Sequence, residues 1–130
     1  MVKKSTAQEA LIYQAYVNGV GGLSTNFNSS GYIYANAYLS NQNHTITSST
    51  NYADGNWHYV AVRMSGTTMQ LWVDNVSIGT VTVNHSFSSI DKSTFSGGSG
   101  SNTELMYVSQ FYIAPSSVVT STEIANIWTY

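Results

Sequence analysis

DGNWHYVAVRMSGTTMQLWVDNVSIG, residues Asp54–Gly79, is the stretch that decides the fold. Apolar residues occupy every second position on either side of the polar segment Ser65–Thr68, which is the period of a half-buried β-strand. If that segment is a hairpin loop, the alternating positions face each other and all lie on one side of the ribbon. The predicted pairs are Val60 with Val73, Val62 with Leu71, and Met64 with Met69.

A second tight turn follows the hairpin at once. Asp74 and Asn75 come directly after the last apolar position, and both residue types tolerate a positive φ angle better than most. A third strand then runs on from this turn. The sequence therefore predicts a three-stranded antiparallel unit.

DGNWHYVAV and the later LWVDN resemble a known signature, "DGxWHHVAV…LYVDG", of laminin G-like domains in the concanavalin A-like lectin/glucanase superfamily. The C-terminal segment YVSQFYIAPSSVVTSTEIANIW, residues Tyr107–Trp128, is similar to the last strand and short terminal helix of that family. The resemblance implies an all-β fold, a two-sheet antiparallel jelly-roll β-sandwich with a short C-terminal helix. It also implies that one or two N-terminal edge strands are absent.

The composition fits one domain over residues 1–130 and excludes several function classes. Charged residues make up 8% of the chain, against about a quarter in ordinary globular proteins. Four basic residues and a net charge of −2 give no cationic footprint for nucleic acid. No apolar run has the length of a membrane span, and without cysteine there is no disulfide or thiolate site.

Outside the central stretch, one further strand is clear. In Tyr32–Leu39 the aliphatic residues Ile33, Ala35, Ala37 and Leu39 alternate with polar or aromatic ones, so the aliphatic face should point inward. Residues 7–17 suit either a helix or a strand, and the family resemblance favours a strand.

The other segments are polar or short. Residues 40–53 are polar, with a brief strand predicted at Thr45–Thr47. Residues 84–102 are rich in Ser and Gly and predict a long surface loop. A strand is predicted at Glu104–Ile113, and a capping box at Thr120–Glu123 predicts a short helix.

The acidic residues do not form a catalytic pair. Glycoside hydrolysis needs two carboxylates on either side of one bond, and the E-x-D-x-x-E strand of the superfamily's glucanases is missing. Glu104 lies on a predicted strand without a visible partner. His58 is interpreted as a histidine at the edge of the core, hydrogen-bonded to backbone, in preference to a catalytic or metal-binding role. We therefore predict that the protein is not an enzyme.

Calcium is the one cofactor to weigh, because many lectin-type domains bind it between loops. Asp54, Asp74 and Asp91 offer oxygen ligands but form no known calcium motif. Asp54 and Asp74 also suit ordinary turn roles. No cofactor is predicted, and a structural calcium is the weaker alternative.

Outward-facing aromatic residues are the candidate ligand or interface surface. In the predicted register Trp72 lies opposite Ala61, with Tyr59 and Arg63 at the diagonal positions and Gln70 alongside. A second outward row of aromatic residues runs along Tyr32–Leu39. The surface comprises Tyr32, Tyr34, Tyr38, Tyr59, Arg63, Gln70 and Trp72. Arg63 is placed to lie over the indole. Such rings suit glycan stacking, a protein interface or cover by another part of the chain.

Two functions follow. The first is a self-associating structural subunit of a virion, tail fibre or extracellular filament, with neighbouring copies pairing edge strands by donating Val2–Val17. The alternative is a carbohydrate-binding, lectin-like adhesion module, assisted by calcium if calcium binds. Both place the protein on an extracellular surface, filament or virion, although no apolar signal-peptide core follows Met1.

Overall fold

The structure, a computed structural model, describes residues 1–17, 21–85, 92–95, 107–108, 122 and 124. Its strands are β1 (Val2–Lys3), β2 (Ala10–Val17), β3 (Gly21–Phe27), β4 (Tyr32–Leu39), β5 (Gln42–Asn51), β6 (Trp57–His58), β7 (Val60–Ser65), β8 (Thr68–Val73), β9 (Val76–Thr82), β10 (Lys92–Phe95) and β11 (Tyr107–Val108).

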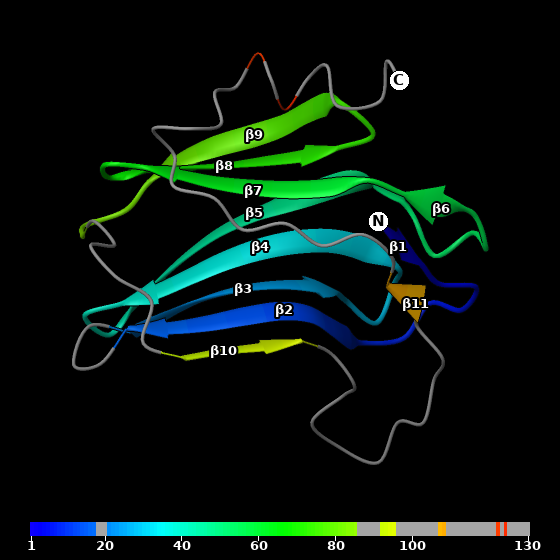
Figure 1. Cartoon of the computed structure of the whole chain (residues 1–130), viewed down its shortest axis with the longest axis horizontal. Helices are drawn as coiled ribbons and strands as arrows, with labels where there is room; N and C mark the ends of the chain where they lie inside the picture. The colour runs from blue at the N-terminus through cyan, green and yellow to red at the C-terminus, as the bar shows by residue number, and fades with distance from the viewer. Residues whose placement is uncertain (18–20, 86–91, 96–106, 109–121, 123, 125–130) are drawn as a thin grey trace.

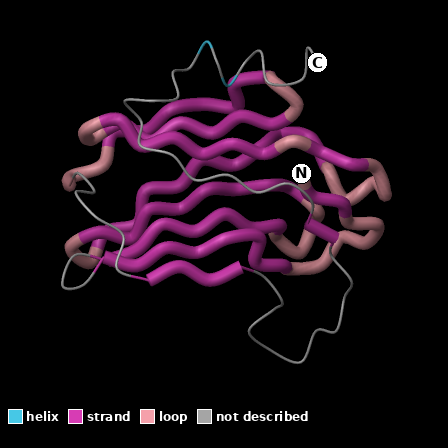
Figure 2. Tube along the Cα trace, viewed as in Figure 1, coloured by secondary structure: helices cyan, strands magenta, loops and turns pink. Residues whose placement is uncertain are grey.

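The strands form two main sheets and one small sheet, as Figure 1 shows. The larger sheet has the order β10-β2-β3-β4-β5, the second has β7-β8-β9, and the small one has β11-β1-β6. Each pairing among the described strands is antiparallel. Figure 2 shows how fully strand dominates the described chain. The predicted two-sheet antiparallel sandwich is confirmed.

The central hairpin has the predicted register. Val60 pairs with Val73, Val62 with Leu71, and Met64 with Met69. The loop is shorter than predicted, because Ser65 and Thr68 also pair and leave only Gly66 and Thr67 between the strands. Gly66 has a φ of 57°, which glycine adopts without steric penalty.

Two further connections between described strands are also tight turns of two residues. Asp74 and Asn75, with φ angles of 50° and 63°, join β8 to β9 as the sequence predicted. Ser40 and Asn41, with φ angles of 49° and 64°, join β4 to β5 in the same way. Two successive positive φ angles are typical of the type I′ turn, whose twist matches that of the flanking strands.

The core lies between the inner faces of the two main sheets. Ile33, Ala35, Ala37 and Leu39 of β4 are all fully buried, which confirms the inward aliphatic face. Met69, Leu71 and Val73 of β8 belong to the same hydrophobic cluster. Interdigitated inner faces of this kind are how β-sandwiches exclude water from their interior.

A bulge in β2 changes which side chain points inward. The pairing of β2 with β3 shifts between Leu11 and Tyr13, and Ile12 is buried with 6% of its surface exposed. Residues 10–17 are a strand, as favoured. This strand lies between β3 and β10 in its own sheet, while β1 pairs with β6 and β11. The donation of Val2–Val17 to a neighbouring copy stays a prediction, and it would require β1 and β2 to leave these partners.

Strand β5 is longer than the predicted Thr45–Thr47. Its inward positions include Ile46 and Ser48, and a single aliphatic residue is too sparse a signal to reveal a strand. Ser48 is buried because its hydroxyl accepts a hydrogen bond from the Ile33 N–H (3.0 Å) and donates one to the Thr50 carbonyl (2.9 Å). Those bonds occur where the pairing of β4 and β5 shifts, and they satisfy backbone groups left by the bulge.

Later segments are described only in part. Within the predicted loop 84–102, β10 forms an edge strand paired with β2, which corrects that prediction for residues 92–95. Of the predicted strand Glu104–Ile113, only β11 is described. The predicted short helix, which opens at the capping box Thr120–Glu123 and ends before Trp128, lies almost wholly outside the described residues. No helix among the described residues has the length and apolarity needed to cross a membrane.

The packing of β8 generates a stability prediction. Leu71→Ala should lower the free energy of unfolding by about 3 kcal/mol, because it leaves a cavity between the sheets at a fully buried position. Val76→Ala on β9, where 61% of the side chain is exposed, is the control and should change stability by less than about 0.5 kcal/mol. Urea unfolding followed by tryptophan fluorescence measures both, and equal losses would contradict the two-sheet core.

Candidate functional site

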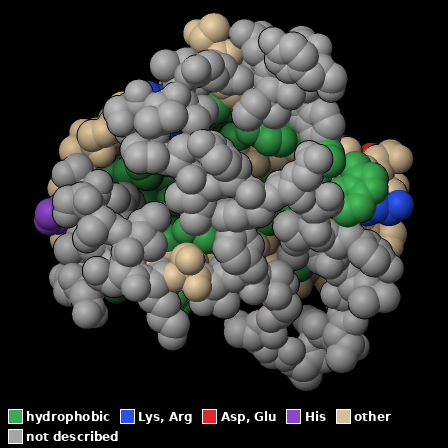
Figure 3. Space-filling view, in the orientation of Figure 1, with side chains coloured by type: hydrophobic (Ala, Val, Ile, Leu, Met, Phe, Trp, Pro, Cys, Tyr) green, Lys and Arg blue, Asp and Glu red, His purple; other side chains and the backbone are tan. Residues whose placement is uncertain are grey.

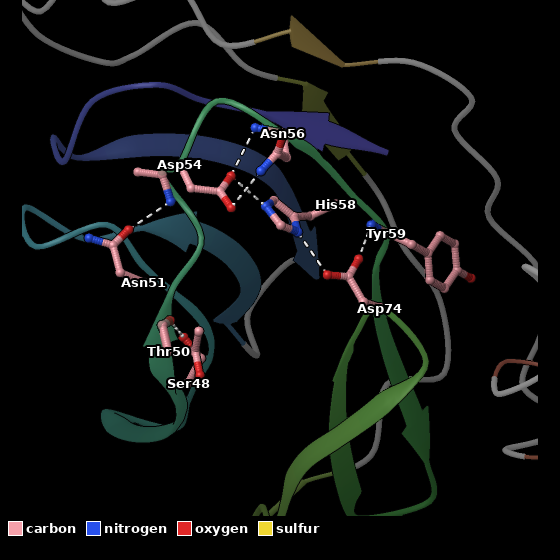
Figure 4. A network of polar contacts seen from close by, with 9 residues as sticks. Ser48, Thr50, Asn51, Asp54, Asn56, His58, Tyr59 and Asp74 are labelled. Carbon is pink, nitrogen blue, oxygen red and sulfur yellow. Dashed lines mark hydrogen bonds and ion pairs between the residues drawn. The ribbon is translucent and has the colours of Figure 1, made fainter.

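The ring of His58 lies between two carboxylates that come from separate turns (Figure 4). Its Nδ1 is 2.7 Å from Asp74 Oδ2 and its Nε2 is 2.9 Å from Asp54 Oδ1. His58 is buried, whereas the side chains of Asp54 and Asp74 are 42% and 44% exposed. We call these three residues the histidine clasp.

Local backbone geometry sets both carboxylates in place. Asp54 caps its own turn by accepting hydrogen bonds from the Asn56 N–H (2.8 Å) and side-chain amide (2.9 Å). Asp74 sits in the positive-φ turn after β8 and accepts a hydrogen bond from the Tyr59 N–H through its other oxygen, Oδ1, at 2.9 Å. Tyr59 lies between β6 and β7, so this bond holds the chain at the point where it passes from the small sheet to the hairpin.

The clasp favours a charged imidazole. Burial opposes that charge, but hydrogen bonds and attraction from Asp54 and Asp74 outweigh it and hold the pKa of His58 above its ordinary value of 6.5. The hydrogen bond from His58, with those from Asn56, lowers the pKa of Asp54 from 3.8 to about 2. Tyr52 packs edge-on against the ring, with centroids 4.9 Å apart. Burial, and then the charge of Asp74, raise the pKa of Tyr52.

This geometry suits a structural link and not proton transfer to a substrate. A general base needs a free ring nitrogen within reach of the reacting proton, and both nitrogens of His58 already face carboxylates. A protonated ring between Asp54 and Asp74 would also repel a cation. Among the described residues, no group of three or more His, Cys, Asp or Glu side chains is arranged to hold a metal ion.

The clasp corrects one interpretation made from sequence. His58 is buried as expected, but its ring bonds to two carboxylates and not to the backbone. Asp54 and Asp74 take the expected turn positions and gain this shared partner. The spacing of Asp54 and His58 was visible in the sequence, and the predicted Val60–Val73 pair brought Asp74 level with Tyr59, but neither pattern indicated that one ring would bind both carboxylates. Asp91 and Glu104 lie outside the described residues.

The predicted surface around Trp72 is not an open one. Trp72 pairs with Ala61 as expected, yet only 5% of its surface is exposed, so it cannot stack on a ligand. Of the three alternatives for this ring, cover by another part of the chain is the one that fits. Arg63 donates a hydrogen bond from Nη1 to Gln70 Oε1 at 3.3 Å, its cross-strand neighbour. Tyr59 is half-buried, and burial raises its pKa.

The outer face of β4 presents the predicted tyrosines unequally. Tyr32 and Tyr34 are half-buried, whereas Tyr38 is 45% exposed. Burial, and then the charge of Glu9, raise the pKa of Tyr34. Tyr16 of β2, 43% exposed, lies on the same face, and the sequence interpretation missed it because residues 7–17 suited a helix as well as a strand.

Uncharged polar side chains surround these tyrosines. Thr45 donates a hydrogen bond to Asn36 Oδ1 (2.9 Å), and the Asn36 amide donates one to Asn43 Oδ1 (3.2 Å). The strand pairings place further polar residues beside them. We call the outer side of strands β2 to β5 the tyrosine face; its members are Gln14, Tyr16, Gly22, Ser24, Asn26, Tyr34, Asn36, Tyr38, Asn43, Thr45 and Thr47.

Comparison with known families identifies the chain. The laminin G domain family matches residues 4–114, and the chain belongs to that family. The match covers the central hairpin and both turns that form the clasp.

A solved laminin structure supports the fold. The chain is similar to domains LG4-5 of the mouse laminin alpha1 chain, with a TM-score of 0.60 and 18% identity over 71% of this chain and 25% of that one. It is also similar, with a TM-score of 0.41 and 22% identity, to an S-layer domain-containing protein from Clostridium thermocellum (residues 221–444), covering 98% of this chain and 66% of that one. This chain thus spans a quarter and about two thirds of those structures. None of the curated proteins matches it.

The clasp generates a pH prediction for the variant His58→Gln. A raised His58 pKa stabilises the fold fully below pH 6.5, and this is lost as pH rises through the raised value. A lowered Asp54 pKa stabilises it above pH 3.8, and this is lost as pH falls toward about 2. The stability difference between wild type and His58→Gln should therefore be largest between those limits, at about 1–2 kcal/mol.

Urea unfolding at a series of pH values measures this difference. His85→Gln, at an exposed position, is the matched control and should give a profile parallel to that of the wild type. A constant difference between wild type and His58→Gln from acid to alkaline pH would show that the ring does not carry the predicted charge.

Proposed function

We propose that this protein is a non-enzymatic adhesive module of an extracellular surface, and that it contacts its partner through the tyrosine face. The observation that carries the proposal is the exposure of Tyr16 and Tyr38 within an uncharged polar face. Exposed aromatic rings among fixed polar groups are typical of recognition surfaces.

Family membership supports the adhesive role. Laminin G domains in general mediate contacts with proteins and glycans and are generally non-enzymatic adhesion modules. The likeness to domains of a laminin chain is a likeness of fold, and it favours an extracellular location without fixing the partner.

The histidine clasp supports the absence of catalysis. It is the natural first place to look for an active histidine, yet each ring nitrogen of His58 already faces a carboxylate, and that ring is buried. Asp54 and Asp74 are separated by the ring, so they do not flank an open space in which a glycosidic bond would fit.

Self-association by strand exchange loses its main argument. Strand β2 has a partner on each side within its own sheet, so a neighbouring copy would have to displace a pairing to receive it. An adhesive contact through a sheet face, by contrast, leaves all these pairings intact. The face is therefore a better candidate surface than the N-terminal strand.

A charge placed in the tyrosine face tests the proposal. Thr45→Lys should reduce the adhesion of protein-coated beads by about tenfold or more, because an unpaired charge in a desolvated contact opposes binding strongly. Thr80→Lys, an equally exposed threonine on β9, is the matched control and should keep full adhesion. The beads are tested on immobilised extracellular-matrix proteins and on immobilised polysaccharides.

Either of two results would contradict the proposal. One is failure of wild-type beads to adhere to any of these surfaces. The other is an equal loss of adhesion in the two lysine variants, which would show that the face has no special part. Thermal unfolding of both variants checks that the fold is intact.

A further inference from the structure

We infer that Tyr16 and Tyr38 form a stacking platform for an uncharged polysaccharide chain. The inference rests on the proposed function and names the ligand class for the same face. It treats the two exposed rings, with Gly22 between them, as one unit.

The strand pairing aligns the two tyrosines across three strands. Tyr16 of β2 pairs with Gly22 of β3, and Gly22 pairs with Tyr38 of β4. The three residues share one face, and neighbouring strands lie about 4.8 Å apart, so the two tyrosine backbones are separated by roughly 10 Å. Two rings carried at these positions can contact different sugars of one extended chain.

Gly22 leaves room for the ring of Tyr16. A Cβ atom at Gly22 would lie 3.5 Å from Cδ1 and 3.8 Å from Cε1 of Tyr16, so the ring lies directly beside the glycine. An aromatic side chain over a cross-strand glycine covers backbone that would otherwise be bare. The ring is thereby supported from below while 43% of the residue stays exposed.

Tyr38 is held by the turn next to it. Its hydroxyl donates a hydrogen bond to Asn41 Oδ1 at 2.9 Å, and Asn41 sits in the tight turn that joins β4 to β5. A ring fixed at both ends loses little conformational entropy when it binds, which favours affinity for a flat ligand. The C–H groups of a pyranose face can pack on the electron-rich face of such a ring.

Polar groups beside the rings suit hydroxyl recognition. The amides of Asn36 and Asn43 and the hydroxyl of Thr45 form one hydrogen-bonded row. Each amide has two N–H donors and an oxygen with two acceptor sites, so these groups keep unused capacity after binding each other. Sugar hydroxyls both donate and accept, and they match such a mixed row.

The absence of charge selects among possible ligands. Strands β2 to β5 place no charged residue on the tyrosine face; Lys92 of the edge strand β10 pairs directly with Tyr16, and Glu9 lies near Tyr34. Figure 3 shows few Lys, Arg, Asp or Glu side chains among the described residues on the side of the molecule that it draws. Anionic glycans and nucleic acids need clustered Lys and Arg, and protein partners favour Arg at contact sites. A neutral polysaccharide needs none.

Affinity electrophoresis in native gels tests the inference. The gels contain mixed-linkage β-glucan, xyloglucan or galactomannan, and heparin serves as the anionic comparison. Wild-type protein should be retarded by at least one neutral polymer, and the retardation should persist from about 50 to about 500 mM salt because no ion pairs contribute. Heparin should not retard it.

Single-ring variants identify the platform. Tyr16→Ser and Tyr38→Ser should each weaken binding about tenfold, since each removes one ring contact. Trp57→Ser, which removes a ring of similar exposure (44%) on β6, is the matched control and should leave binding unchanged. All three positions are exposed, and thermal unfolding checks that the variants remain folded.

Three outcomes would overturn the inference: no retardation by any neutral polymer, retardation by heparin alone, or equal binding by wild type and both tyrosine variants. These outcomes are separate from failure of the proposed function. Bead adhesion to a protein surface that Thr45→Lys abolishes, without retardation in any gel, would leave the adhesive role intact and remove the polysaccharide.

Discussion

One imidazole ring joins two turns of this chain. His58 binds a carboxylate four residues before it and another sixteen residues after it. These contacts fix the point where the chain leaves the small sheet at β6 and enters the hairpin β7–β8. Asp74 strengthens the same junction, because its second oxygen binds the backbone N–H of Tyr59. The position of the three-stranded sheet over the core therefore depends on a polar link at its end as well as on apolar packing.

Apolar packing then determines which faces remain available for binding. The inner face of β4 holds only aliphatic side chains, and its small residues Ala35 and Ala37 let the second sheet approach closely. Close approach also occurs at Gly79, where a Cβ atom would lie 3.3 Å from the Ile46 side chain. Because the aliphatic residues of these strands are buried in the core, the outer face of the same strands consists mainly of Tyr, Asn, Thr and Ser. The composition of the tyrosine face is thus a consequence of strand alternation.

Local patterns predicted the part of the fold that depends on neighbouring residues. The hairpin register, the Asp74–Asn75 turn and the inward face of β4 all follow from alternation and turn chemistry, and all are confirmed. Strand β5 was largely missed because its inward positions include a serine, Ser48, that satisfies backbone groups at a bulge.

The candidate surfaces depended more on contacts that alternation does not encode. Residues 7–17 suited a helix as well as a strand, so Tyr16 was not recognised as an outward residue until its pairing with Gly22 of β3 was known. Trp72 has the outward parity that the pattern assigned to it, but it is buried all the same. The clasp required Asp74 to meet His58 across the junction between two sheets. In each case a long-range contact decided the result.

The charged groups of the clasp and the exposed aromatic rings therefore have different roles, the first in stability and the second in the proposed recognition. The described carboxylates of the clasp face an imidazole and stabilise the fold, and their effect changes with pH. The tyrosine face holds its rings and amides by neutral hydrogen bonds, such as those of Tyr38 with Asn41 and of Asn36 with Asn43. Neutral contacts give no long-range steering, so recognition there would depend on shape, stacking and fixed hydrogen-bond geometry. A chain with so few charges can therefore use them for stability and keep its exposed face neutral, which is what a ligand rich in hydroxyl groups and free of charge requires.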